Sequence, residues 1–209
     1  MAGKTPSAPG EEKGWKDLLQ LDPLEVSRRS LATYDHESRK YTLRVLTVDY
    51  DVMLGDRAVM PAGRKDAGIA DLGLEFRIMI LDYLTNSKEI SLSGRLVSGA
   101  QLKAGEFFFR GTHGFELDAL VNAFGNKPEQ FMKTGFSLGG KTLQLGDASF
   151  QLPILPRVPI VYVLWAADEE FSARLSVLFD STADSHMHLD TLRTAVTTAN
   201  KFLLAAKPQ

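Results

Sequence analysis

Four short runs in the C-terminal half of the chain alternate apolar and polar residues, and they restrict the fold more than any other feature. The apolar positions are Leu143 and Leu145, Phe150 and Leu152, Ile160–Leu164, and Leu175, Val177 and Phe179. A period of two residues, interrupted by Gly-Asp, Pro-rich and Asp-Glu-Glu connections, predicts strands joined by turns. We therefore expect a mostly antiparallel sheet in this half of the protein.

Helical spacing marks the two long segments that should cover this sheet. The segment Leu72–Leu84 is apolar almost all round, apart from Glu75, Arg77 and Asp82, and its length predicts a buried central helix. The last element should be an amphipathic helix, because one stripe of its surface is apolar. That stripe consists of Leu189, Leu192, Val196, Ala199 and Leu203.

Shorter elements complete the expected fold. Asp22 and Pro23 predict the cap and first residue of a helix that ends near Tyr34. Tyr41–Leu54 has the β-branched and aromatic alternation of two strands or one bent ribbon, and Pro61–Ala70 has the composition of a loop. Thr112 is expected to cap a further helix, which should end at Gly125 in a left-handed conformation. A short helix is expected over Pro128–Lys133.

The chain therefore predicts an α+β protein with a single domain over residues 15–209. A chain of 209 residues hides roughly 70% of its extended surface on folding, enough for one sizeable core. Residues 1–14 lack any hydrophobic period and are rich in Pro, Gly, Ser and charge, so they are expected to form a disordered tail. We detect no internal repeat.

Composition excludes several classes of protein. The chain has no cysteine, which removes disulfides, thiolate zinc sites, iron–sulfur clusters on this chain and a cysteine nucleophile. The net charge of −2 argues against a nucleic-acid-binding surface. There is neither a signal-peptide pattern nor an uncharged apolar run of ~18 residues, so we expect a cytoplasmic protein without a membrane anchor.

Residues Gly135–Thr142 match the phosphate-binding loop pattern G-x-x-x-x-G-K-[ST]. That loop binds phosphate because a strand precedes it and a helix N-terminus follows it directly. Here a helical, polar segment precedes the match, and the alternating residues after Thr142 predict a strand. We therefore interpret the match as a Gly-Gly turn that enters a β-hairpin.

The densest polar cluster lies between the last strand and the C-terminal helix. It contains Asp180, Ser181, Asp184, His186, His188 and Asp190. On an extended backbone His186 and His188 would project the same way, which suits a divalent metal beside Asp184 or Asp180. On a helix His186 and Asp190 would pair instead. A third interpretation is a polar turn in which Asp180 or Asp184 accepts backbone N–H bonds and caps the helix.

Other candidate positions are more isolated. Asp168, Glu169 and Glu170 are paired carboxylates of the kind used in acid–base chemistry, or the solvated end of a hairpin. His113 follows three phenylalanines and would line an aromatic ligand pocket, ligate a metal, or lie at a helix terminus on the surface. Trp165, at a strand end, is a further candidate ligand-binding residue or a core residue. The G-x-S-x-G pattern of one serine hydrolase fold is absent.

Several local features of the C-terminal half occur together in one known family. They are Gly146-Asp147, the Leu152–Pro159 stretch, Trp165–Glu170 and Leu178–Ser181, with support from Leu72–Leu84 and Phe124-Gly125. In these features the chain resembles the bacterial and archaeal family called domain of unknown function 3786. The resemblance implies a setting in anaerobic corrinoid or one-carbon metabolism, in which a partner protein carries any redox or corrinoid centre. Some relatives carry a cysteine-rich iron–sulfur segment, which this chain lacks.

Two functions follow as expectations. The first is a non-enzymatic accessory module that binds a cofactor, such as a corrinoid or another tetrapyrrole, or a partner protein. Its candidate ligand-binding residues are Asp180, Ser181, Asp184, His186, His113 and Trp165. The second is a metal-assisted enzyme built on residues 180–190, with His186 and His188 as metal ligands.

Overall fold

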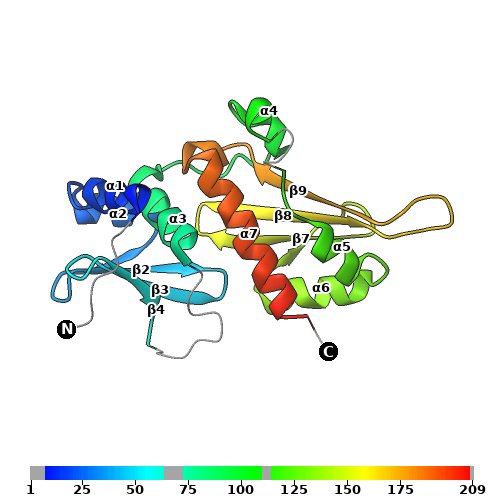
Figure 1. The fold of residues 1–209 in the computed structure, drawn as a ribbon, viewed down its shortest axis with the longest axis horizontal. Helices are drawn as coiled ribbons and strands as arrows, with labels where there is room; N and C mark the ends of the chain where they lie inside the picture. The colour runs from blue at the N-terminus through cyan, green and yellow to red at the C-terminus, as the bar shows by residue number, and fades with distance from the viewer. Residues whose placement is uncertain (1–7, 64–72, 110–113, 208–209) are drawn as a thin grey trace.

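The structure is a computed structural model that describes residues 8–63, 73–109 and 114–207. It contains two antiparallel sheets, one of four strands in the order β1-β2-β3-β4 and one of five in the order β5-β9-β8-β7-β6. Helices lie between and across them (Figure 1). The predicted α+β, single-domain fold is therefore confirmed.

The larger sheet combines three of the predicted C-terminal strands with two short strands that the sequence did not predict. Its strands are β5 (Leu96–Ser98), β6 (Lys141–Thr142), β7 (Ala148–Leu155), β8 (Val158–Trp165) and β9 (Arg174–Asp180). The aromatic rings of Phe150 and Tyr162 lie opposite each other in register and are fully buried. The Tyr162 hydroxyl donates to Asn200 Oδ1 of the C-terminal helix at 2.7 Å, which fixes that helix against the sheet.

One predicted strand is wrong. Leu143 and Leu145 do not form a strand, because β6 ends at Thr142. The backbone amides of both leucines donate to Ser149, to its carbonyl oxygen and its hydroxyl respectively, so the segment turns around that residue. Lys141 and Thr142 form β6, so no helix begins directly behind the Gly-Gly pair. A phosphate-binding loop would need that helix, and its rejection is therefore supported.

The smaller sheet is a meander of strands that follow one another in the chain. Its strands are β1 (Thr33–Asp35), β2 (Lys40–Val45), β3 (Val48–Met53) and β4 (Ala58–Pro61). The two strands expected over Tyr41–Leu54 are therefore present. One face buries Tyr41, Leu43, Tyr50 and Val52, and the other carries ion pairs such as Lys40–Asp51 at 2.7 Å. Most of the predicted loop over Pro61–Ala70 lies outside the described residues.

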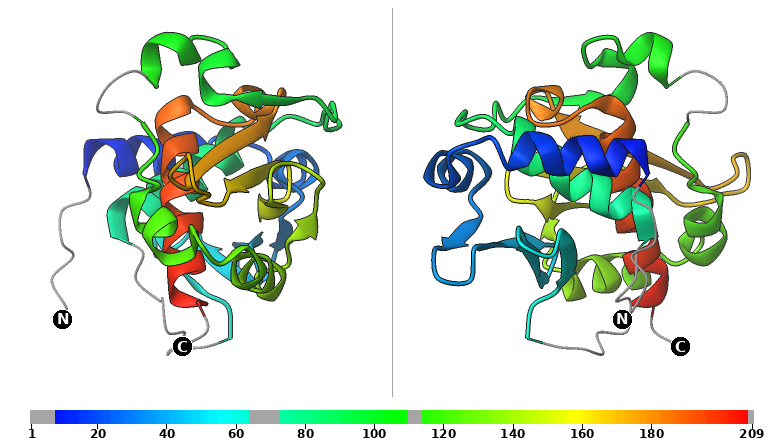
Figure 2. Two further views of the ribbon diagram at one scale, coloured as in Figure 1. Left: turned by 90° about the vertical axis from the view of Figure 1, so that its right-hand side faces the viewer. Right: turned by 60° about the vertical axis from the view of Figure 1, so that its left-hand side comes forward.

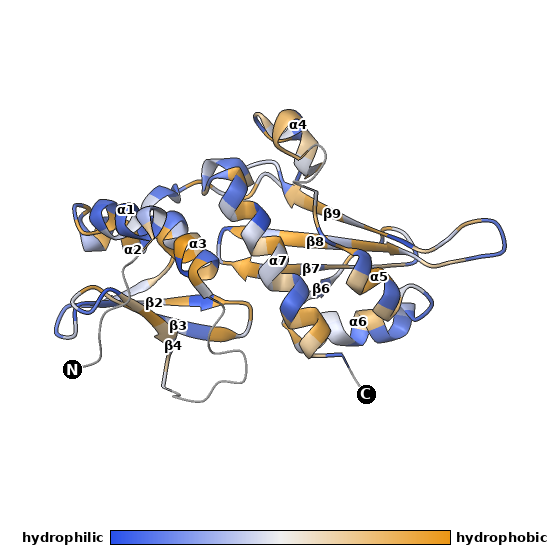
Figure 3. Ribbon diagram, viewed as in Figure 1, coloured by the Kyte–Doolittle hydropathy of each residue, from blue (hydrophilic) through white to orange (hydrophobic). Residues whose placement is uncertain are grey.

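Two long helices join the sheets. These are α3 (Gly73–Asn86), the predicted central helix, and α7 (Leu189–Ala205), the predicted C-terminal helix. The buried residues of α3 include Phe76, Met79, Ile80 and Tyr83. The two helices contact each other, and Figure 2 shows α1 lying across α3. Figure 3 shows hydrophobic residues gathered on the strands that α7 covers.

The predicted tail is wrong from Pro9 onward, because Pro9–Leu18 forms helix α1. Trp15 and Leu18 are buried against the core, and the carboxylate of Glu11 pairs with Arg77 of α3 at 2.7 Å. Gly14 allows this close packing, since a Cβ there would lie 3.0 Å from Leu81 Cβ. These tertiary contacts stabilise a helix that local propensity does not predict.

The shorter helices differ from expectation mainly at their ends. They are α2 (Pro23–Ser30), α4 (Gly105–Phe108), α5 (Asp118–Phe124) and α6 (Pro128–Ser137). Asp22 caps α2 as predicted, but left-handed Leu31 ends the helix before Tyr34. Gly125 is not left-handed, because its φ is −52°. Glycine is needed there for space, since a Cβ would lie 2.7 Å from Ala173 Cβ. Thr112 lies outside the described residues.

Candidate functional site

Helices α1, α3 and α7 enclose a polar pocket of about 430 Å³ at the point where α7 begins. Its polar lining includes Lys13, Asp17, Asp82, Asn86, His188 and Asp190. The three elements come from distant parts of the chain and lie side by side (Figure 2). Charged groups are concentrated here.

Asp82 is the central residue of this pocket, and its side chain is only 10% exposed. Its Oδ1 accepts hydrogen bonds from His188 Nδ1 at 2.6 Å and from Asn86 Nδ2 at 2.8 Å. Its Oδ2 accepts from the His188 backbone N–H at 2.9 Å and from the Thr191 hydroxyl. These contacts give both oxygens of the Asp82 carboxylate hydrogen-bond partners.

The Asp82 carboxylate also performs the role of a helix cap. His188 occupies the N-cap position of α7 and makes no side-chain capping bond of its own. Asp82 therefore supplies, from another helix, an acceptor for a backbone N–H at this N-terminus, where negative charge is stabilising. This contact explains why α3 and α7 meet at this position.

The same contact orients the His188 imidazole. When the carboxylate accepts this bond, Nδ1 of His188 carries the proton, and Nε2 lies on the side of the ring away from Asp82. The His188 side chain is 70% exposed, and no described residue bonds to Nε2. A carboxylate-oriented imidazole with an accessible Nε2 can accept a proton, accept a hydrogen bond or ligate a metal.

His186 lies in a different environment from His188. It follows the short turn Ala183–Ser185 with helical backbone angles and is completely buried. Its Nδ1 accepts the backbone N–H of Lys88 at 3.3 Å, and its Nε2 has no partner among the described residues. The two histidines therefore do not project together from an extended segment, and His186 does not pair with Asp190 within α7.

Burial lowers the pKa of His186 to about 4, and the positive charge of Arg157 acts in the same direction. In the unfolded chain the imidazole takes up a proton near pH 6.5, whereas the folded protein keeps it neutral to lower pH. The unfolded state therefore binds more protons between these values. We expect the free energy of unfolding to fall by about 2 kcal/mol between pH 7 and pH 5 because of this group.

Urea denaturation at the two pH values measures this loss. In the His186→Gln variant the difference between pH 7 and pH 5 should shrink by most of that amount. The exposed His36 provides the matched control, and His36→Gln should leave the difference unchanged. An equal pH dependence in wild-type protein and His186→Gln would contradict the assignment.

Asp180, Ser181 and Asp184 hold segments of the backbone together. Asp180 Oδ2 accepts the N–H of Gly94 at 2.7 Å, and its Oδ1 accepts from both the backbone and the hydroxyl of Ser93 and Thr182. The backbone N–H of Ser181 donates to the Arg95 carbonyl oxygen, and Asp184 Oδ2 accepts the backbone N–H of Lys103 at 2.7 Å. Burial acts to raise the pKa of Asp180, but these hydrogen bonds lower it to about 2.

Trp165 and residues 168–170 lie at the far end of the larger sheet from the Asp82–His188 pocket (Figure 1). Trp165 ends β8, and the guanidinium of Arg174 stacks over its ring. Asp168, Glu169 and Glu170 form an exposed hairpin end, as one interpretation predicted. His113 lies outside the described residues. Within the described ranges, no group of three or more His, Asp or Glu side chains is arranged to hold a metal ion.

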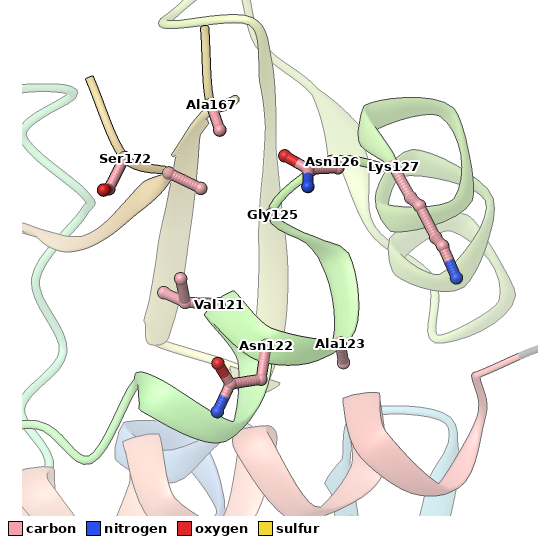
Figure 4. Close-up of a pocket in the computed structure, with 9 residues that line it drawn as sticks. Val121, Asn122, Ala123, Gly125, Asn126, Lys127, Ala167 and Ser172 are labelled. Carbon is pink, nitrogen blue, oxygen red and sulfur yellow. The ribbon is translucent and has the colours of Figure 1, made fainter. Parts of the chain in front are cut away.

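A second pocket of about 340 Å³ lies between the end of α5 and the β8–β9 hairpin. Figure 4 shows Asn126 and Ser172 beside it, with Lys127 extending away from the other labelled residues. Its lining includes Asn122 and Asn126 but neither a carboxylate nor an imidazole. This second pocket therefore lacks the proton-transferring and metal-binding groups that Asp82 and His188 provide in the first.

The sequence alone did not identify Asp82 as a site residue. A signal was present, because Asp82 is one of three charged residues in the otherwise apolar Leu72–Leu84 segment. A charged residue on a buried helix requires a partner. Here that partner is His188, 106 positions further along the chain.

The fold and the pocket define an α+β protein with a carboxylate-oriented histidine at a junction of three helices. None of the described helices is long and apolar enough to cross a membrane. The chain belongs to the family described as domain of unknown function (DUF3786), whose model matches residues 22–200. The predicted resemblance is thereby confirmed. No curated protein and no solved structure matches the chain significantly.

Proposed function

We propose that this protein is a cytoplasmic, non-enzymatic accessory module that uses His188 Nε2 to bind a metal-centred macrocycle. The macrocycle is a corrinoid or another tetrapyrrole, held as a cofactor or presented by a partner protein in anaerobic one-carbon metabolism. The observation that carries the proposal is the 2.6 Å bond between Asp82 and His188.

The chain offers such a group one nitrogen donor, Nε2 of the exposed His188. A corrin or porphyrin supplies most ligands of its own metal, so this single imidazole would be enough to hold the group. Metal-bound histidines usually donate their second ring N–H to a carboxylate, which fixes the tautomer and raises the basicity of the ligating nitrogen. Asp82 makes this bond, and Thr191 and Asn86 donate to the same carboxylate.

When bound, the macrocycle would supply redox or group-carrying chemistry at its metal. The residues of this chain would bind and orient it. Asp82 keeps the proton on Nδ1 of His188, and its near-complete burial protects that bond from competition with water. The exposed edge of the imidazole would remain accessible to a ligand.

Absorbance spectra of the purified protein with hydroxocobalamin, and separately with haemin, test the proposal. We expect axial ligation to shift the spectrum of at least one of them, and His188→Ala to abolish the shift. His36→Ala, which removes an exposed histidine at the turn after β1, should retain it. Asp82→Asn should weaken binding by at least about tenfold.

Unshifted wild-type spectra with both compounds would overturn the proposal, as would a shift that survives in His188→Ala. The metal-assisted enzyme is the second candidate, because His188 and Asp190 line the same pocket. Stoichiometric metal in the protein as isolated, lost in His188→Ala and present without the absorbance bands of a macrocycle, would favour that enzyme instead.

A further inference from the structure

The end of the β8–β9 hairpin, which we call the hairpin tip (residues 166–173), projects beyond the larger sheet (Figure 1). Phe171 lies on this tip and is 69% exposed. Exposing a large apolar side chain to water is unfavourable. Aromatic residues are enriched at protein–protein interfaces, where a partner covers them.

Three hydrogen bonds hold residues 168–171 of the hairpin tip in a turn. Asp168 Oδ1 accepts the N–H of Glu170 at 2.9 Å and that of Phe171 at 2.7 Å. The Asp168 N–H donates to the Phe171 carbonyl at 3.0 Å. Phe171 is thus presented on an ordered turn, which reduces the entropy lost when a partner binds.

A pocket of about 580 Å³ lies beside Phe171, and aromatic surface contributes to its lining. It is bordered by Trp165, Phe171, Arg174 and the carboxylates of Asp147 and Asp168. The Arg174 guanidinium carbon lies 4.3 Å from the centroid of the Trp165 ring. This intramolecular contact shows that the indole face accepts a guanidinium group.

The charge around this pocket is unbalanced. Asp147 and Asp168 line it, and Glu169 and Glu170 are exposed on the adjoining turn, whereas Arg174 is the basic residue in its lining. Four carboxylates against one guanidinium leave a local net charge of −3. Hydrogen bonds from the backbone N–H groups of Phe171 and Glu170 lower the pKa of Asp168, which keeps its charge in place.

We propose that the hairpin tip is a docking surface for a basic, arginine-containing segment of a partner protein. An arginine side chain of the partner enters the pocket, pairs with Asp147 or Asp168, and packs its methylenes against Phe171. Arginine fits better than lysine, because its planar guanidinium both stacks on aromatic rings and binds carboxylates through two N–H groups. This surface is separate from the His188 pocket, so the inference does not depend on the proposed function.

Fluorescence anisotropy with a labelled peptide of four arginines spaced by glycines tests the proposal on the full chain. We expect saturable binding that weakens as salt is raised. Phe171→Ala should weaken binding by about fivefold. The double variant Glu169→Gln, Glu170→Gln should weaken it by several-fold at low salt.

Two variants elsewhere serve as matched controls. Phe136→Ala removes another exposed phenylalanine, and Glu37→Gln removes an exposed carboxylate from the turn after β1, so both should bind like wild type. The hairpin-tip variants change exposed side chains and should keep the wild-type thermal unfolding midpoint.

Three results of the peptide assay would overturn the proposal. They are absence of peptide binding, equal weakening in the control and hairpin-tip variants, and equally tight binding of a matched four-lysine peptide. Concentration-dependent dimerisation of the wild type that is lost in Phe171→Ala would identify a second copy of this chain as the occupant instead, and would also overturn it.

Discussion

Replacing Asp180 with alanine is expected to lower the free energy of unfolding by about 4 kcal/mol. Asp180 is 3% exposed, and its two oxygens accept hydrogen bonds from three backbone N–H groups and two hydroxyls. Alanine would leave these donors without their acceptor at the end of β9. Urea denaturation followed by circular dichroism measures the change.

Asp184→Ala is the matched control for this experiment. Its carboxylate lies four positions further along the chain and accepts one backbone N–H, that of Lys103, at an exposed position. We expect a loss of about 1 kcal/mol. Equal effects of the two substitutions would show that the Asp180 network does not stabilise the fold in the way its geometry indicates.

Replacing Gly135 with valine is expected to lower the free energy of unfolding by about 3 kcal/mol. Gly135 lies in α6, where a Cβ would be only 2.5 Å from Cδ1 of the Phe150 ring. That ring is fully buried between Phe131 and Tyr162, with centroid distances of 4.6 and 5.8 Å, so it has little room to move. The gain in helix propensity from replacing glycine with valine is less than about 1 kcal/mol and does not offset this clash.

A double-mutant cycle tests whether the clash is the cause. Combining Gly135→Val with Phe150→Leu should destabilise less than the sum of the single substitutions, by at least about 1 kcal/mol. Gly10→Ala in α1 is the control, because its Cβ would be in ordinary contact, 3.4 Å from Ile78 Cδ1. Strictly additive effects of the pair would contradict the explanation.

Several elements of the fold could be predicted because their signals are local. The alternation over Phe150–Leu152, Ile160–Leu164 and Leu175–Phe179 corresponds to β7, β8 and β9, and the apolar segment around Leu72–Leu84 to α3. The wrong predictions have tertiary causes. Helix α1 depends on its packing against α3, and the turn at Leu143–Leu145 depends on hydrogen bonds to Ser149.

The candidate site was only partly predictable. The sequence drew attention to His188 but offered Asp180, Asp184 and His186 as its companions, because these residues are its neighbours along the chain. The structure instead turns His186 into the core and pairs His188 with Asp82 of α3. Asp180 and Asp184 bind backbone N–H groups, as the turn interpretation predicted, but its prediction that they cap the C-terminal helix is wrong, because Asp82 accepts the N–H at the start of α7.

The sequence by itself determined the positions of β7, β8 and β9 and of the helices α3 and α7, because the period of apolar residues acts over a few positions. It also excluded cysteine chemistry on this chain, since the residues for it are missing. Only the tertiary structure decided which imidazole is accessible and which carboxylate orients it. The reason is physical: the bond between Asp82 and His188 joins two helices that are distant in the chain, and packing of the shared core brings them together.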